Sequence, residues 1–268
     1  MIRKFNDVKK SHLANIFSFI LINLDLLNLL GLILPNYSIG SDFKSIEAAL
    51  SYEFSYTFKP LYITKTNQAL PIIIDQEKGK IEQAIWGLRG SSKAQKIYPW
   101  IRSEGIIKKQ PTRALIRHNR CLIPANGFFI QQAPGKSYFV YFPKNKIITF
   151  GGIWKTLSDD ELNIKTIVFA IISCPSNGKI SGLTNRVPLV IHPGARRNFL
   201  KKEKPLMDIT RLLKKENNLD FNGVPVSSEI FRKPDISKID FIHSKQKLLK
   251  TREFPEKSIL GSYYYHQS

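Results

Sequence analysis

Short apolar runs and alternating apolar and polar residues recur through the middle of the chain, and both patterns predict β-strands. The strand candidates are rich in β-branched and aromatic residues and are separated by turn residues; they are residues 58–62, 70–74, 81–88, 138–141, 146–154, 165–173 and 186–191. Helical spacing of apolar residues is confined to residues 42–52, 110–118, 194–200 and 208–216. Many strands and few short helices predict an α+β fold.

The first 40 residues follow a different pattern, and we assign residues 1–40 to an N-terminal extension. Residues 1–10 are basic, and residues 13–34 are mostly Leu, Ile and Phe but include Asp25. About 20 apolar residues can span a bilayer, yet a carboxylate near its centre costs roughly 2.5–3.5 kcal/mol. Three interpretations stay open: an anchor in or on a membrane, an amphipathic helix docked on the domain, and a wrongly assigned start codon.

The rest of the chain is predicted to form one domain over residues 41–242, followed by a basic tail, residues 243–268, that we expect to be disordered. The 268 residues include 41 Lys and Arg against 21 Asp and Glu, a net charge of +20. An excess of this size is typical of proteins with a polyanionic partner, either nucleic acid or an acidic membrane surface.

The two cysteines, Cys121 and Cys174, are too few for a disulfide scaffold and lie in no metal-binding pattern. We therefore expect a reducing compartment, no metal and no cofactor. Cys174 follows a long apolar run, which predicts a buried small side chain at the end of a strand.

Residues 120–129, Arg-Cys-Leu-Ile-Pro-Ala-Asn-Gly-Phe-Phe, join a helix with Arg113 and Arg117 on its polar side to a strand. Pro124 cannot donate a hydrogen bond to a sheet, and the dipeptide Asn126-Gly127 tolerates positive φ. The chain is therefore expected to turn before the strand begins. Taken alone, this pattern fits a structural corner as well as a functional junction.

This segment resembles the central motif of the SOS response-associated peptidase (SRAP) family, the abasic-site processing proteins, which usually reads Arg-Cys-Leu-Val/Ile-Pro-Ala-Asp-Gly-Phe-Tyr-Glu-Trp. Other segments resemble the family's landmarks in the same order; they are Trp86-Gly87-Leu88, Phe150-Gly151-Gly152-Ile153-Trp154, Asn185-Arg186-Val187-Pro188-Leu189-Val190 and Val224-Pro225-Val226-Ser227. The resemblance implies a strongly bent, barrel-like antiparallel sheet with peripheral helices.

The resemblance also implies a chemistry, the capture of an abasic site in single-stranded DNA. In the family, the amine of an N-terminal cysteine forms a Schiff base with the sugar aldehyde and its thiol closes a thiazolidine ring, while an Asn, a Glu and a His assist. At these positions the present sequence has Leu34, Trp100, Ile130 and Thr184, respectively. The resemblance therefore does not establish an enzyme, and we assign no catalytic residue.

The positions that would hold nucleic acid are matched. Arg102 and Arg186 correspond to family arginines beside the DNA, where a planar and permanently charged group suits phosphate oxygens. Trp86 corresponds to a tryptophan on which a base can stack, worth about 1–3 kcal/mol. Each has a structural alternative: a core tryptophan for Trp86, an ion pair with Glu104 for Arg102, and a buried hydrogen-bonded arginine for Arg186.

We therefore predict a monomeric protein of the DNA damage (SOS) response that binds single-stranded or gapped DNA. It would lie in the cytoplasm at the nucleoid and lack cross-linking and peptidase chemistry. Trp86, Arg102 and Arg186 are expected to face one groove. One alternative is an active abasic-site processing enzyme with a displaced nucleophile, for example Lys65. The other is a membrane-tethered basic module that meets anionic headgroups.

Overall fold

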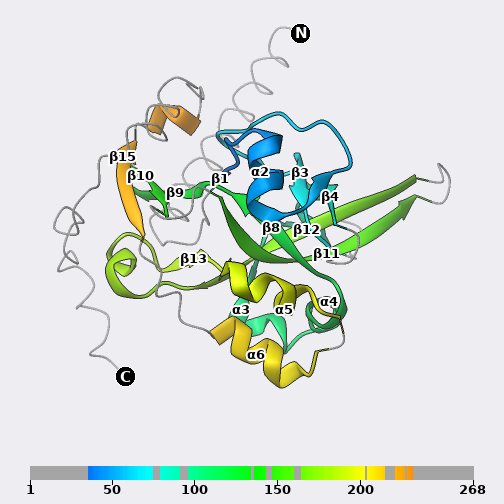
Figure 1. Ribbon diagram of the computed structural model, residues 1–268. Coiled ribbons are helices and arrows are strands. Elements are labelled where there is room, and N and C mark those ends of the chain that lie inside the picture. The colour runs from blue at the N-terminus through cyan, green and yellow to red at the C-terminus, as the bar shows by residue number, and fades with distance from the viewer. Residues whose placement is uncertain are drawn as a thin grey trace, which may run out of the picture.

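Two β-sheets carry the fold, and a group of helices lies at one end of the larger sheet (Figure 1). The structure is a computed structural model that describes residues 36–74, 79–90, 96–133, 136–142, 147–159, 164–202, 204–214, 221–226 and 228–231. Mixed strands and helices confirm the predicted α+β class.

The larger sheet has nine strands, five of them in the order β14-β11-β12-β4-β2 and four attached beside this path. The strands are β2 (Glu53–Phe54), β3 (Ala69–Ile72), β4 (Lys80–Trp86), β7 (Trp100–Arg102), β8 (Arg120–Ala125), β11 (Ile148–Asp159), β12 (Ile164–Pro175), β13 (Arg186–Pro188) and β14 (Val190–Ile191). The two longest, β11 and β12, form an antiparallel pair, and β12 also pairs in parallel with β4 and β7. Strand β12 is therefore the central strand, which pairs with β11 and β13 as well as with β4 and β7.

The smaller sheet has the order β1-β9-β10-β15 and is wholly antiparallel. Its strands are β1 (Tyr37–Ser38), β9 (Gly127–Ala133), β10 (Lys136–Tyr141) and β15 (Asn222–Val226), and a separate two-stranded sheet is formed by β5 (Leu88–Arg89) and β6 (Ile97–Tyr98). Among the described residues both main strand orders are open paths, so the barrel-like form expected from the resemblance is not confirmed.

The segment around Asn126-Gly127 carries the chain from β8 in the larger sheet to β9 in the smaller one. The Asn126-Gly127 dipeptide tolerates positive φ, but the fold does not use this freedom, because neither residue is among those with positive φ. A Cβ atom there would instead stand 2.3 Å from the carbonyl oxygen of Val140. Close backbone approach, rather than a left-handed turn, is the reason for a glycine at this junction.

The side chain of Asn126 fastens the same junction to the start of the domain. Its Nδ2 donates to Ser41 Oγ at 2.7 Å, and its Oδ1 accepts from the Ser41 backbone N–H at 3.1 Å. Asn126 is buried, so these bonds satisfy polar atoms that water could not reach easily. The central motif is thus a structural corner in this fold.

The helices are short; they are α2 (Phe43–Leu50), α3 (Ser103–Ile106), α4 (Thr112–His118), α5 (Arg196–Leu200) and α6 (Leu206–Lys214), with 3-10 turns η1 (Gly178–Gly182), η2 (Pro193–Ala195) and η3 (Ser228–Phe231). Asp42 caps α2 by accepting a hydrogen bond from the Ser45 N–H at 2.9 Å, as the sequence pattern indicates. Ile46 and Leu50 form its buried face. None of the helices that the structure describes is long and apolar enough to cross a bilayer.

Aromatic side chains from both sheets meet in the main core. The Tyr37 ring lies edge-on to Trp86, with centroids 5.3 Å apart, and to Phe150, with centroids 5.8 Å apart. Phe128 of β9 contacts Phe150 of β11 in the same manner at 6.3 Å. This packing joins the two sheets, and each such ring pair adds about 0.5–1.5 kcal/mol beyond its buried area.

The strand predictions for residues 58–62 and 186–191 need correction. Residues 58–62 form no strand, only one bridge between Ile39 and Leu61. The predicted strand 186–191 is two strands, because β13 pairs with β12 whereas β14 pairs with β11. The predictions for the extension up to residue 35 and for the tail fall outside the described residues.

Candidate nucleic-acid interface

Arg186 is the first residue of β13, where that strand pairs with the end of β12, and it is held by four hydrogen bonds. Its Nη1 and Nη2 donate to the two carboxylate oxygens of Glu104 at 2.7 and 2.8 Å, a bidentate pair. Its Nε and Nη2 donate to the side-chain and backbone oxygens of Ser173 at 3.1 and 2.8 Å. The residue is 8% exposed, which is the geometry of a buried hydrogen-bonded arginine.

The ion pair with Glu104 that we considered for Arg102 is therefore made by Arg186. The Arg186 guanidinium holds the pKa of Glu104 at about 2, and a hydrogen bond from Ser103 Oγ to the carboxylate acts in the same direction. Glu104 thus stays ionised at neutral pH and offsets the charge of Arg186. A phosphate approaching this point would meet a neutralised pair.

Arg102 stands beside this pair with a different environment. It is the last residue of β7, its Cα is in register with Ser173 of β12, and its side chain is exposed. Within the described part of the chain its guanidinium has no hydrogen bond or ion pair. Arg102 is consequently an exposed cation without a partner among the described residues, and it lies next to Arg186, whose charge is paired with Glu104. Its strand, β7, pairs with β12.

Trp86 occupies the core. It is 1% exposed, its Nε1 donates to the Pro99 carbonyl oxygen at 2.9 Å, and its ring is covered by Tyr37 and Trp100. In this structure the ring offers no open face to a base, and its surroundings are those of the core alternative. We expected Trp86, Arg102 and Arg186 to face one groove. Of the three, only Arg102 is exposed, whereas Trp86 and Arg186 are buried.

Trp100 is the tryptophan that sequence reasoning missed as a binding candidate. It packs edge-on against Trp86 with centroids 5.8 Å apart, yet it is only partly buried. Because successive side chains of a strand alternate between faces, Trp100 and Arg102 of β7 lie on the same face. This alternation is the sequence signal that could have paired them.

The family's acid and base positions hold groups without acid–base function. Ile130 of β9 is 3% exposed and belongs to the main hydrophobic cluster. Thr184 Oγ1 donates to the Arg186 carbonyl oxygen at 3.0 Å, so its hydroxyl is used by the local backbone. Gln132, two residues after Ile130, donates to the Gly182 carbonyl oxygen at 3.1 Å and thereby brings β9 to the loop that precedes Thr184.

The start of the domain reaches the same neighbourhood. Strand β1 runs antiparallel to β9, and the Phe129 N–H donates to the Asn36 carbonyl oxygen at 2.8 Å. Residue 36 therefore lies beside the residue that precedes Ile130. Thr64 Oγ1 donates to the Tyr37 carbonyl oxygen at 2.9 Å, which places the exposed Lys65 near the start of β1.

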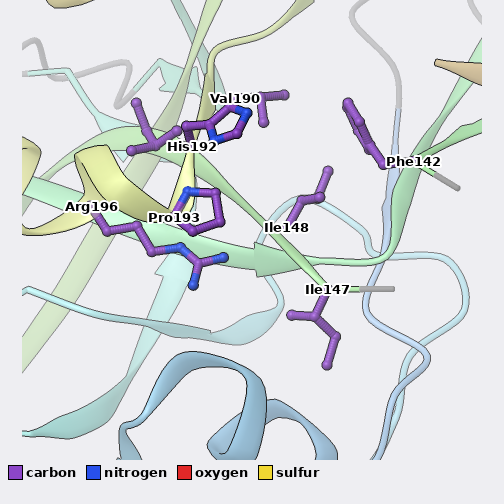
Figure 2. A pocket seen from close by; sticks show the side chains of 8 residues that line it. Phe142, Ile147, Ile148, Val190, His192, Pro193 and Arg196 are labelled. Carbon is purple, nitrogen blue, oxygen red and sulfur yellow. The ribbon is translucent and has the colours of Figure 1, made fainter. Parts of the chain in front are cut away.

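A small pocket lies elsewhere, at the end of β14, with room for about one water molecule. Figure 2 shows its lining residues, which are Phe142, Ile147, Ile148, Val190, Ile191, His192, Pro193 and Arg196. Arg196 Nε donates to Thr149 Oγ1 at 3.2 Å, and burial lowers the pKa of its guanidinium. The pocket is too small for a substrate and holds none of the predicted site residues.

Comparison with known proteins identifies the class of this fold. The family model of SOS response associated peptidase (SRAP) matches residues 36–233, and the chain belongs to this family. Family membership confirms the relationship that the sequence motifs indicate. No curated protein matches the sequence.

Several solved structures share the fold, and three of them cover nearly three quarters of this chain. A protein from Bacteroides thetaiotaomicron has a TM-score of 0.66 and 18% identity, covering 74% of this chain and 94% of its own. A protein from Bordetella bronchiseptica has a TM-score of 0.60 and 12% identity, covering 72% of this chain and 100% of its own. A phage-related protein from Bordetella bronchiseptica has a TM-score of 0.57 and 15% identity, covering 72% and 94%. The chain thus spans nearly the full length of each.

Proposed function

We propose that this SRAP-family protein binds single-stranded or gapped DNA in the response to DNA damage, at the edge formed by β7 and the end of β12. We propose further that it does so as a monomer and without the cross-linking chemistry of its family. The observation that carries the proposal is the open guanidinium of Arg102 on the same strand face as the partly exposed Trp100.

These two side chains suit the two parts of a single-stranded nucleotide. A guanidinium can donate two parallel hydrogen bonds to phosphate oxygens, and its charge releases counterions from the strand. An indole ring can stack on any base, so such a site has little sequence preference. Trp100 takes over here the stacking role that we expected for Trp86, whose ring is buried.

Arg186 has a supporting role in this proposal. Its guanidinium fixes Glu104 on α3 to Ser173 on β12, which sets the end of β7 and the start of α3 in place. Arg102 is the residue that joins β7 to α3, so the pair holds the backbone on which the open cation stands. A change at Arg186 would therefore alter the position of Arg102 as well as the local charge.

The proposed absence of cross-linking chemistry rests on the cysteines. Ring closure needs an amine and a thiol on adjacent carbons, which only an N-terminal cysteine provides. The sequence has no cysteine before Cys121, so trimming of the preceding extension could not expose one. Cys121 and Cys174 are both buried, and burial raises the pKa of both thiols, which disfavours the reactive thiolate.

Fluorescence anisotropy with a labelled single-stranded oligonucleotide tests the binding site. Arg102→Ala should weaken binding about 5- to 10-fold at low salt and reduce the slope of log K against log salt by about 0.7, the value for one phosphate contact to a single strand. Trp100→Leu should weaken binding about tenfold with little change in slope, because it removes stacking and no charge.

Lys80→Ala is the matched control, since Lys80 is exposed at the start of β4 and its loss also removes one positive charge. Its affinity should stay within about twofold of the parent, as expected for a charge outside the contact. If Lys80→Ala and Arg102→Ala weaken binding equally, the effect is one of net charge and the proposed site is wrong.

An active enzyme with a lysine nucleophile is the second candidate, and the place of Lys65 favours it. The hydrogen bond between Thr64 and Tyr37 holds Lys65 near the start of β1, where the family's N-terminal segment runs. A lysine amine can form an imine with an aldehyde and release water, but it cannot close a thiazolidine. Reduction with borohydride would therefore distinguish this candidate from the first.

A further inference from the structure

The surface formed by α4 and α5 carries exposed basic side chains that make no hydrogen bond or ion pair within the described residues. Between Glu104 and Asp159 the sequence has no acidic residue. Arg113 and Arg117 of α4 are both exposed and stand one helical turn apart, where like charges repel by a few tenths of a kcal/mol. Their helix therefore keeps a mildly unfavourable arrangement on its outer face.

Arg120 shows how closely α5 approaches α4. Its Nη1 donates to the carbonyl oxygens of Ile116 and Arg117 at 2.6 Å each, near the end of α4. Its Nε donates to the carbonyl oxygen of Phe199 at 2.6 Å and its Nη2 to that of Lys201, at the end of α5. One guanidinium thus joins the two helix ends, and Arg117 and Lys201 are neighbours on the surface.

The hydrogen bonds of Arg120 also mean that Arg113, Arg117 and Lys201 are not needed to bind the carbonyl groups at the helix ends. Basic side chains near a helix end commonly interact with its last carbonyl groups. Here Arg120 binds carbonyl groups at both helix ends, and it is itself 2% exposed. The charges of Arg113, Arg117 and Lys201 therefore remain directed to the outside.

Among the described residues, no acidic side chain is paired with Arg113, Arg117 or Lys201. Helices α4 and α5 contain none, and Asp208 of the neighbouring α6 lies 3.8 Å from Arg211, one turn further along its own helix. Figure 1 shows α4, α5 and α6 grouped at the end of the molecule below the larger sheet. The exposed cations thus form a patch at one end of the fold.

The residue types on this patch favour one form of nucleic acid. Binding of single strands relies on large aromatic rings for the bases, whereas the sole Phe, Tyr or Trp residue of α4 and α5, Phe199, is fully buried. A duplex keeps its bases inside and presents one phosphate charge per about 1.7 Å of its axis. Exposed cations without an exposed Phe, Tyr or Trp ring therefore fit duplex DNA better than single-stranded DNA.

We propose that the surface of Arg113, Arg117 and Lys201 binds the phosphate backbone of duplex DNA, separately from the edge that carries Arg102. This inference rests on the proposed function only in taking DNA as the polyanion. The contact reads no sequence, and its strength should fall steeply with salt.

The test measures anisotropy of a blunt duplex and, in parallel, of a single strand of the same length, with the full chain. Arg113→Ala together with Arg117→Ala should weaken duplex binding about tenfold and reduce the salt slope by about 1.8, since each phosphate contact to B-DNA contributes about 0.9. Single-strand binding should stay within about twofold, because Arg102 and Trp100 are unchanged.

A charge-matched control and a folding control accompany the pair. Lys44→Ala with Lys80→Ala removes the same charge from exposed positions on α2 and β4 and should leave duplex affinity within about twofold. Arg113→Gln with Arg117→Gln retains the long side chains, and it should lose duplex affinity as the alanine pair does. Thermal unfolding of each variant shows whether α4 keeps its structure.

Unchanged duplex affinity in both α4 pairs, or an equal loss in the control pair, would overturn the inference. Binding of the same variants to vesicles with anionic headgroups is measured in parallel. If the α4 pairs weaken vesicle binding but not duplex binding, the surface is assigned to a membrane instead. If Arg102→Ala leaves single-strand binding intact while the α4 pairs weaken duplex binding, the proposed function fails and this inference stands.

Discussion

Two regions of the molecule use arginine in parallel ways. At the strand ends, Arg186 is buried and Arg102 is exposed. At the helix ends, Arg120 is buried and Arg113 and Arg117 are exposed. In each region the buried guanidinium fixes the backbone that carries the exposed ones. An arginine in a family motif can thus support the fold or face a partner, and its burial and hydrogen bonds distinguish the two roles.

The two buried guanidinium groups differ in what balances their charge. Arg186 has the carboxylate of Glu104, whose pKa falls to about 2. Among the residues that the structure describes, the partners of Arg120 are all backbone carbonyl groups, and burial lowers the pKa of its guanidinium to about 10. With that pKa, Arg120 stays charged at neutral pH. The charge of Arg120 is stabilised by dipoles alone, so its loss leaves several carbonyl groups without a donor.

The largest effect is therefore expected at Arg120. Arg120→Met should lower the free energy of unfolding by on the order of 3–5 kcal/mol, because it leaves buried carbonyl groups at two helix ends without partners. Denaturant unfolding would measure the change, with Arg117→Met, an exposed position on α4, as the control. Equal stability of the two variants would show that Arg120 does not hold α4 to α5.

A smaller loss is expected at the strand ends. Arg186→Met should cost about 2 kcal/mol, because Glu104 is about half exposed and can be solvated by water after its partner is lost. Glu104→Gln should cost less, about 1 kcal/mol, since the amide oxygen can still accept one hydrogen bond. Denaturant unfolding of both single variants and the double variant gives their coupling. A coupling near zero would contradict the bidentate pair.

The pH dependence of stability distinguishes the regions further. The folded-state pKa of Glu104, about 2, lies below the ordinary value of 4.5, so the unfolded chain binds more protons between these values. The stabilisation is complete above pH 4.5 and is lost as pH falls toward 2. Glu104→Gln should flatten this part of the curve, whereas Arg120→Met should leave its shape unchanged. An unaltered acid limb in Glu104→Gln would contradict the assignment.

The exposed arginines should show the smallest effects on stability. Arg102→Ala, and Arg113→Ala with Arg117→Ala, should change the free energy of unfolding by no more than about 0.5 kcal/mol, as is usual for exposed positions without partners. Thermal and denaturant unfolding would measure this. A loss above about 2 kcal/mol would show that these side chains support the fold, and that loss of DNA binding in the same variants reports unfolding.

Much of the fold was accessible from the sequence because its strands are apolar on at least one face. The apolar run 165–173 lies within β12, and helical spacing located α2 and α4. The split between β13 and β14 was not accessible. At Leu189 the chain passes from pairing with β12 to pairing with β11, and this change depends on where the two strands lie in space.

The site was harder to predict because short motifs do not show burial. Trp86 matches its motif but lies in the core, while Trp100, at a position where the family has a different residue, retains exposed surface. Glu104 is two residues from Arg102, yet it pairs with the distant Arg186. Local spacing suggested the nearer partner, whereas the pairing of β7 and β13 with β12 decides it.

Incubation with single-stranded DNA carrying one abasic site, followed by a denaturing gel with and without borohydride, tests the central claim most directly. The same DNA is also used in a native binding assay, so that binding and bond formation are measured on one substrate. We predict binding in the native assay and no heat-stable adduct on the gel. A band that requires borohydride would indicate a lysine imine, with Lys65→Ala as the first variant to make. A heat-stable cross-link formed without reductant would contradict the account.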